Sequence, residues 1–170
     1  MDARAERQPA SRGFTLVEVL VVLVLFGVLA AMIVPAVRTD EQRTLEREAA
    51  RLAGALEQAS ATAQWRGETL GISADGRSYR FWRRDADGQW GLLVQDEGLA
   101  PRVLPAAVEI AADRFAGAQV ARDAILPLRP SGRNEPYRLL LSAGQWYVPV
   151  DADPLNRVTF TVLQKRNAGG

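Results

Sequence analysis

The sequence contains neither cysteine nor histidine among its 170 residues. The lack of cysteine excludes a disulfide framework and thiolate chemistry, although it does not choose a cellular compartment. The lack of histidine removes the commonest general base and the commonest metal ligand. The formal net charge is +1, so no strong basic field favours a nucleic-acid partner. With few residue types left for catalysis, we expect no catalytic residue, no metal and no cofactor.

Charge is also missing from one long stretch, which runs from Val19 to Val37. At about 1.5 Å rise per residue, a helix of this length spans roughly the hydrocarbon core of a bilayer. We therefore expect residues 14–37 to form a transmembrane helix. Gly27 and Pro35 interrupt the run, and Pro35 is expected to bend or loosen the helix because proline lacks a backbone donor. Membrane helices also tolerate such residues without a functional reason.

One carboxylate, Glu18, lies at the start of this apolar run. A carboxylate in the middle of a membrane helix costs on the order of 3 kcal/mol, and less near the interface. Cleavage between Gly13 and Phe14 would create a cationic amine one helical turn before Glu18. If subunits stack side by side with a small axial step, the carboxylate of one subunit meets the amine of its neighbour and fixes the register.

The run Gly-Phe-Thr-Leu-Val-Glu, from Gly13 to Glu18, resembles the processing motif of type IV pilins and type II secretion pseudopilins. The resemblance implies that a prepilin peptidase removes residues 1–13 and methylates the amine of Phe14. It also implies that Glu18 helps the subunit to enter a filament, and Pro35 falls where such pilins place a helix-distorting proline. An uncleaved signal anchor or a secretory signal peptide is the alternative, but neither explains this glutamate beside a Gly-Phe junction.

The leader carries three arginines, whereas a long soluble part follows the apolar run. Positive charge on the short side of a single span favours a cytoplasmic amino terminus. We therefore expect an inner-membrane protein with one span, whose carboxy-terminal domain lies in the periplasm.

A second helical pattern follows over residues 38–66. Apolar residues recur there at steps of three and four, which predicts an amphipathic helix with one packing stripe. The stripe consists of Leu45, Ala49, Leu52, Leu56, Ala59 and Ala63. The helix is expected to continue from the apolar run and to end near Arg66-Gly67. This stripe is expected to pack on a sheet of the same chain.

Residues 67–164 alternate between strand and turn patterns, and the polar tail, residues 165–170, is expected to fray. The expected strands are Leu70–Ser73, Ser78–Arg83, Gln89–Val94, Val108–Ala111, Ala124–Leu128, Tyr137–Ser142, Gln145–Val150 and Arg157–Leu163. Residues 95–107 are expected to form a loop, and residues 116–123 a mobile excursion. The expected fold class is α+β, with a long helix packed on an antiparallel sheet or sandwich.

The second half of the chain also resembles the H class of minor pseudopilins. The segments that carry this resemblance are Arg66-Gly67, Leu70-Gly71-Ile72, Tyr79-Arg80-Phe81, Ala124–Leu128, Pro130-Ser131-Gly132 and Tyr137-Arg138-Leu139. It implies a subunit at the tip of a short periplasmic filament that supports export of folded proteins across the outer membrane. The implied partners are the I, J and K minor pseudopilins, the major pseudopilin, the prepilin peptidase and inner-membrane lipid, with the secreted substrate or the secretin as further candidates.

Two other functions stay open at this point. A minor pilin of a type IV pilus, acting in motility or DNA uptake, shares the same domain type. A membrane-anchored periplasmic enzyme or binding module is the alternative of a different class.

Two groups of side chains were weighed as ligand sites. Asp85, Asp87 and Gly88 resemble the opening of a calcium loop, but the closing carboxylate, Glu97, falls one position late, so a turn is expected. Asp151 and Asp153 are also expected to form a turn.

Ser131 lacks a histidine base, which argues against nucleophilic catalysis.

Aromatic residues could also form a stacking platform for single-stranded nucleic acid. The candidates are Tyr79, Arg80, Trp82 and Trp90. Their alternation along neighbouring strands favours the core and rim of a sheet instead, and no nucleic acid is expected as a partner.

Overall fold

The computed structural model describes residues 16–96, 98–161 and 164–165, and within this part it leaves the side chains of residues 29–39 undescribed. The chain divides into two compact units, Met1–Arg38 and Thr39–Gly170, which we describe separately. The predicted processing junction at Gly13 and Phe14 lies outside the described residues, as does most of the predicted tail.

The first unit contains the beginning of helix α1 (Leu16–Arg66). The helix assignment has no break at Gly27 or at Pro35. The predicted distortion at Pro35 stays a prediction, because its side chain lies outside the described part. Among the described residues, no helix has the length and apolarity that a membrane crossing requires. Residues 14–15 and the side chains of residues 29–39, which belong to the predicted transmembrane segment, lie outside the description.

Helix α1 ends where its sequence predicts. Gly67 has a φ of +66°, a left-handed conformation that glycine adopts without the steric cost of a Cβ. The amide of Glu68 donates a hydrogen bond to the carbonyl oxygen of Ala63 at 3.1 Å, which is the six-to-one bond of a Schellman cap. Arg66 in the last turn also complements the negative end of the helix dipole. The chain therefore leaves the helix abruptly and enters the first strand at Leu70.

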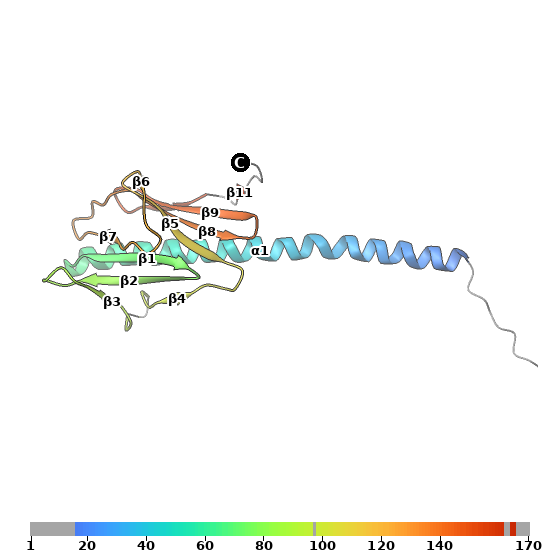
Figure 1. Ribbon diagram of the computed structural model, residues 1–170, viewed down its shortest axis with the longest axis horizontal. Coiled ribbons are helices and arrows are strands. Elements are labelled where there is room, and N and C mark those ends of the chain that lie inside the picture. The colour runs from blue at the N-terminus through green and yellow to red at the C-terminus, as the bar shows by residue number, and fades with distance from the viewer. Residues whose placement is uncertain (1–15, 97, 162–163, 166–170) are drawn as a thin grey trace, which may run out of the picture. The chain divides into compact units, whose positions relative to one another are not determined.

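The second unit is built around the predicted stripe of α1. All six stripe residues are fully buried, which confirms the prediction from their spacing. They pack in one core with the inward-facing residues of the sheet, among them Ile72, Phe81, Leu139 and Val150. Figure 1 shows the strands gathered along this half of the helix. The α+β fold class with a helix packed on an antiparallel sheet is confirmed.

One antiparallel sheet contains all the strands that the structure describes. The strands are β1 (Leu70–Gly76), β2 (Ser78–Arg84), β3 (Trp90–Leu92), β4 (Arg102–Val103), β5 (Glu109–Phe115), β6 (Ala118–Gln119), β7 (Leu126–Leu128), β8 (Tyr137–Ala143), β9 (Trp146–Ala152), β10 (Val158–Phe160) and β11 (Gln164–Lys165). The main path runs β10-β9-β8-β5-β1-β2-β3, while β4 pairs with β2, β6 with β5, β7 with β1 and β11 with β9.

The predicted hairpins are present, with adjusted ends. β1 and β2 pair from Leu70 opposite Arg83 to Asp75 opposite Ser78, so β1 continues through part of the predicted turn. β8 and β9 form the second hairpin, in which Ala143 lies opposite Trp146. The alternating burial of β8 explains why its strand pattern was readable in the sequence.

Two expected irregular segments contain short strands instead. β4 lies inside the loop expected over residues 95–107, and its Arg102 is paired with Tyr79 of β2. β5 is longer than expected and turns through Ala116 and Gly117, both with positive φ, into β6. The excursion expected over residues 116–123 was therefore wrong in its first part, because this part closes a hairpin with β5.

Removing a stripe side chain should destabilise the second unit. We expect Leu52→Ala to lower the free energy of unfolding by about 2–5 kcal/mol, because Leu52 is fully buried and its loss leaves a cavity. Chemical denaturation followed by circular dichroism measures this change. Trp65→Ala is the matched control on the same helix: Trp65 is 92% exposed, and its loss should change stability by no more than about 0.5 kcal/mol. Equal losses in the two variants would contradict the packing role of the stripe.

Candidate assembly surfaces

The first candidate surface is the beginning of α1, which we call the apolar segment (residues 16–28). Every residue in this segment is exposed, and the exposed fraction of its large apolar side chains ranges from 43% at Val22 to 81% at Leu16. Apolar side chains surround this part of the helix on all sides. A helix of this kind is normally covered by protein or lipid, because exposed apolar patches of more than a few hundred Å² mark interaction surfaces.

The predicted site residues fall on or beside this segment. Glu18 is exposed in the first turn of α1, where a negative charge complements the positive end of the helix dipole. Gly27 lies in the helix interior, and no atom lies within 4 Å of the place where a Cβ would stand. Gly13 and Phe14 lie outside the described residues, so the structure does not place them relative to Glu18.

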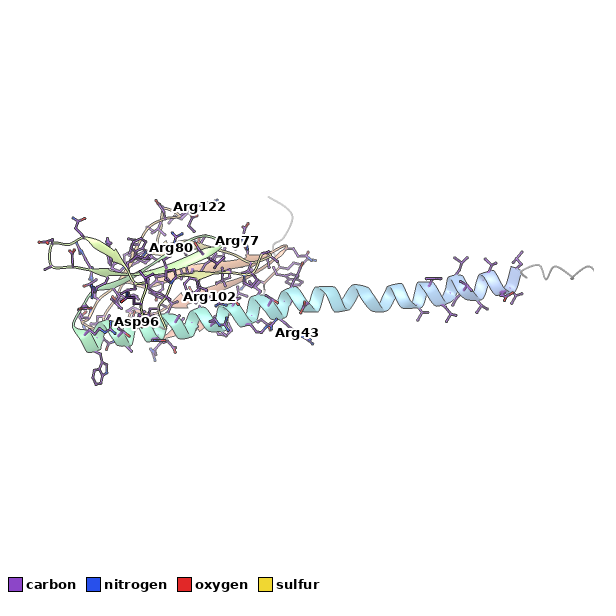
Figure 2. The ribbon with its side chains drawn as sticks, turned by 90° about the horizontal axis from the view of Figure 1, so that it is seen from below. Arg43, Arg77, Arg80, Asp96, Arg102 and Arg122 are labelled. Carbon is purple, nitrogen blue, oxygen red and sulfur yellow. The ribbon has the colours of Figure 1, made fainter. Side chains whose placement is uncertain are left out.

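The second feature is an ion pair between α1 and β4 that the sequence analysis missed. Arg102 donates from Nε and a terminal nitrogen to both carboxylate oxygens of Glu48, at 2.9–3.1 Å. The hydrogen bonds that Arg102 donates to Glu48 raise the pKa of Arg102 further above its usual value, so the guanidinium stays charged. Figure 2 shows Arg102 beside the second half of α1. This bidentate geometry is the strong form of a charge-assisted hydrogen bond, and it fixes β4 on the helix.

A signal for this pair was present in the sequence. Glu48 lies three residues after Leu45 and four before Leu52, so helical periodicity places it on the buried stripe. Its side chain is only 9% exposed. A buried carboxylate needs a charged or hydrogen-bonding partner. The partner could not be named from the sequence, because Arg102 lies 54 residues further along the chain.

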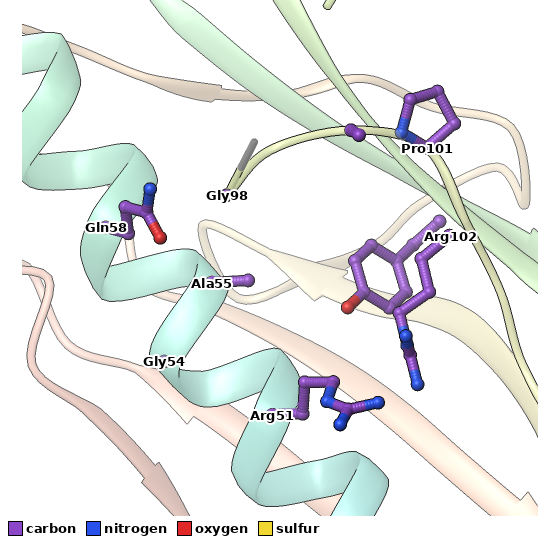
Figure 3. A pocket seen from close by; sticks show the side chains of 9 residues that line it. Arg51, Gly54, Ala55, Gln58, Gly98, Pro101 and Arg102 are labelled. Carbon is purple, nitrogen blue, oxygen red and sulfur yellow. The ribbon is translucent and has the colours of Figure 1, made fainter. Parts of the chain in front are cut away.

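Beside this ion pair lies a cavity of about 540 Å³, which we call the α1–β4 pocket. Its lining residues are Arg51, Gly54, Ala55 and Gln58 of α1, Tyr79 of β2, and Gly98, Ala100, Pro101 and Arg102. Figure 3 shows the α1 residues facing the segment that carries Gly98 and Pro101. The Glu48–Arg102 pair holds this segment beside the helix and therefore helps to shape the pocket.

Another exposed surface lies at the end of α1. A groove of about 450 Å³ is formed by residues of the last helical turns and of the β9–β10 turn, among them Trp65 and Leu155. Trp65 is 92% exposed and Leu155 is 58% exposed. Sequence reasoning placed Trp65 only at the helix end and did not assign it a surface role.

The carboxylates that were weighed as calcium ligands are used by the fold. Asp85 accepts a hydrogen bond from the amide of Gln89 at 2.7 Å, which confirms the expected turn. Asp153 accepts bonds from the amides of Leu155 and Arg157, and these bonds hold the pKa of its carboxyl below the usual value. Among the described residues, no group of three or more acidic, histidine or cysteine side chains is placed to hold a metal ion. Glu97 lies outside the description.

Asp151 does not belong to the turn in which it was expected. It lies in β9 rather than in the turn, and it accepts a hydrogen bond from Nε of Arg138 on β8 at 2.7 Å. Ser131 forms a local turn with Arg133, to whose carbonyl oxygen its hydroxyl donates.

The position of Tyr79 contradicts the alternative of an aromatic stacking platform. This residue is 3% exposed and faces the core, whereas Arg80 is exposed on the opposite side of β2. The indole nitrogen of Trp82 donates to the hydroxyl of Ser73 at 2.8 Å, and Trp90 lies under the guanidinium of Arg84. The four candidates therefore do not share one surface.

The Glu48–Arg102 pair should be coupled energetically. We expect Arg102→Ala to lower the free energy of unfolding by about 1.5–3 kcal/mol, because the buried Glu48 carboxylate loses its charged donors. The double variant with Glu48→Ala should lose less than the sum of the single losses, as a double-mutant cycle of denaturation curves measures. Arg47→Ala is the control, since the bonds of Arg47 stay within the helix. Strict additivity would argue against the pair.

Comparisons with known proteins find one match at the beginning of the chain and another that covers most of it. Residues 9–34 match the family model described as the prokaryotic N-terminal methylation motif. The type II secretion system protein H of Pseudomonas aeruginosa is 29% identical over 140 residues, which cover 80% of this chain and 78% of that protein.

Solved structures show the same fold at low sequence identity. The minor pseudopilin EpsH from the type II secretion system of Vibrio cholerae matches with a TM-score of 0.60 and 17% identity, covering 73% of this chain and 97% of that chain. The solution structure of Escherichia coli GspH matches with a TM-score of 0.56 and 18% identity, covering 75% and 92%. Motif, sequence and fold together show that this chain resembles the H-class minor pseudopilins of type II secretion systems.

Proposed function

We propose that this chain is a minor pseudopilin, a structural subunit of the pseudopilus of a type II secretion system. It supports the export of folded proteins across the outer membrane and performs no chemistry itself. The observation that carries this proposal is the combination of a methylation motif, an exposed apolar helix and an H-class fold on one chain.

The apolar segment supplies the anchor in this proposal. Its side chains are covered by inner-membrane lipid before assembly and by the helices of neighbouring subunits after assembly. The exposure of every residue over 16–28 supports this, because a contiguous apolar surface marks an interaction site. The amino terminus is cytoplasmic, and the unit Thr39–Gly170 lies in the periplasm.

Processing prepares the chain for assembly. The prepilin peptidase cuts between Gly13 and Phe14 and methylates the new amine, which stays cationic. Glu18 of one subunit then pairs with the amine of Phe14 on a neighbour, and this contact sets the axial register. The position of Glu18 in the first turn of α1 supports the proposal, because it lies at the end of the helix nearest to the cut.

The remaining partners contact the periplasmic unit. We place the chain near the filament tip, with the I, J and K minor pseudopilins and the major pseudopilin as its neighbours. The secreted substrate or the secretin contacts the exposed side of the sheet.

Gly13→Leu should block maturation in the native host. The branched side chain obstructs the close approach of the peptidase to the backbone at the cut. Intact mass spectrometry should show a chain that keeps residues 1–13 and has no methyl group. Ala10→Leu adds similar bulk three residues before the cut, and this control should mature normally. A methylated chain that begins at Phe14 in the Gly13 variant would refute the assigned junction.

Glu18→Ala should impair assembly without impairing membrane insertion. Removal of one partner from an ion pair in apolar surroundings costs about 3–5 kcal/mol, so co-isolation with other pseudopilins should fall at least tenfold. Secreted proteins should then accumulate in the periplasm. Glu46→Ala, an exposed carboxylate on the same helix, is the control and should secrete normally. Normal secretion and co-assembly by the Glu18 variant would count against the register contact.

A further inference from the structure

The α1–β4 pocket is lined by Tyr79, whose side chain is largely buried and whose hydroxyl has no hydrogen-bond partner among the described residues. Tyr79 is 3% exposed and lines the pocket. Among the hydrogen bonds of the described residues, none involves its hydroxyl. Burial raises the pKa of Tyr79, so the hydroxyl stays protonated and is ready to donate. Because the Tyr79 side chain lines the pocket, this free donor is available to a ligand that enters there.

Arg51 supplies a positive charge at the same pocket. Its side chain is 59% exposed, and its contact with Glu48 is 3.7 Å long, beyond hydrogen-bond distance. The two oxygens of Glu48 are already bonded to Arg102. The guanidinium of Arg51 therefore keeps donors for another group. Arg51 and Tyr79 both line the pocket.

The charges around the pocket favour an anionic ligand. Arg51, Arg102 and Glu48 together carry a net charge of +1, and Gln58 adds an amide group to the lining. Glu48 is engaged by Arg102, so it offers little repulsion to an incoming carboxylate.

Gly54 gives an independent reason to expect a partner here. A glycine in a helix interior costs roughly 0.5–1 kcal/mol relative to alanine. Gly54 does not have a positive φ, and no atom lies within 4 Å of the place where its Cβ would stand. The fold of this chain therefore gives no reason for glycine at this exposed position. A backbone that approaches the helix from outside does give one.

The pocket has room for a ligand larger than a small free anion. A cavity of about 540 Å³ is many times the roughly 30 Å³ that one water molecule occupies in the liquid. Its lining beside the donors consists of small residues, such as Ala55 and Ala100. Such a site accommodates a side chain together with part of the main chain that carries it.

We propose that the α1–β4 pocket receives an aspartate or glutamate side chain from the periplasmic unit of a neighbouring filament subunit. Its carboxylate accepts hydrogen bonds from the Tyr79 hydroxyl and the Arg51 guanidinium, while the neighbour's main chain passes over Gly54. The proposal rests on the proposed function, because it requires a neighbouring subunit in a filament.

The test uses the full-length chain in membranes of its host. Arg51→Lys places a primary amine at the pocket, and a carbodiimide joins amines to carboxylates that touch them. Arg47→Lys is the matched control, one helical turn away and outside the pocket lining. We expect mass spectrometry to find a cross-linked peptide that joins position 51 to an aspartate or glutamate of another subunit with a methylation motif. A product confined to Glu48 of the same chain, or one equally abundant from position 47, overturns the proposal.

Two further variants separate binding from folding. Tyr79→Phe removes only the hydroxyl, and Gly54→Leu fills the space above the helix. Tyr79→Phe should reduce co-isolation of neighbouring subunits about tenfold, as expected for the loss of a hydrogen bond to a charged group. Gly54→Leu should reduce it at least as much, because the leucine side chain blocks the neighbour's main chain. Both should leave the midpoint of thermal unfolding unchanged. Tyr147→Phe, whose hydroxyl bonds to Gln164 outside the pocket, is the control. Normal co-isolation by both pocket variants overturns the proposal.

The outcomes also separate this proposal from the proposed function. If the unmodified chain fails to co-isolate with any other pseudopilin, the assignment as a filament subunit fails. If the unmodified chain co-isolates and the pocket variants behave like it, only the assignment of the pocket fails.

Discussion

The burial of one helical stripe against the sheet is the contact on which the rest of the structure depends. A single helix serves two environments: from Leu45 to Ala63 it gives one face to its own core, whereas over residues 16–28 every residue is exposed. The stripe therefore fixes which faces of α1 remain available to other molecules. In the second unit the free faces carry Arg51, Gly54 and Trp65, and in the apolar segment every face is free.

The ion pair between Glu48 and Arg102 adds a charged contact to this hydrophobic packing and lies beside the α1–β4 pocket. Hydrophobic contacts position α1 against the sheet, and Leu99, Leu104 and Val108 bury the chain between β3 and β5 in the same core. The bidentate bond fixes that chain on the helix at β4, and the pocket forms between them. A buried ion pair is weak support for stability, since desolvation offsets its attraction. Here it adds a directional contact at β4 to the hydrophobic burial of Leu99 and Leu104 on either side.

Local sequence patterns predict most of the architecture. The remainder could not be predicted from the sequence, and the reasons are physical. The stripe, the helix end at Gly67 and the two hairpins follow from periodicity, from a left-handed glycine and from alternation. The processing junction, which a short motif predicts, lies outside the described residues and stays a prediction. β4 and β6 have two residues each, too few to show alternation. The unpartnered hydroxyl of Tyr79 depends on contacts that no local pattern contains.

The abrupt end of α1 at Gly67 has a mechanical consequence. Because Leu70 begins β1 only three positions later, this strand runs back beside the helix, as Figure 1 shows. A pull along the helix axis therefore loads the stripe in shear, and all six of its contacts resist together. Unzipping, in which contacts break one after another, would need a force across the axis instead.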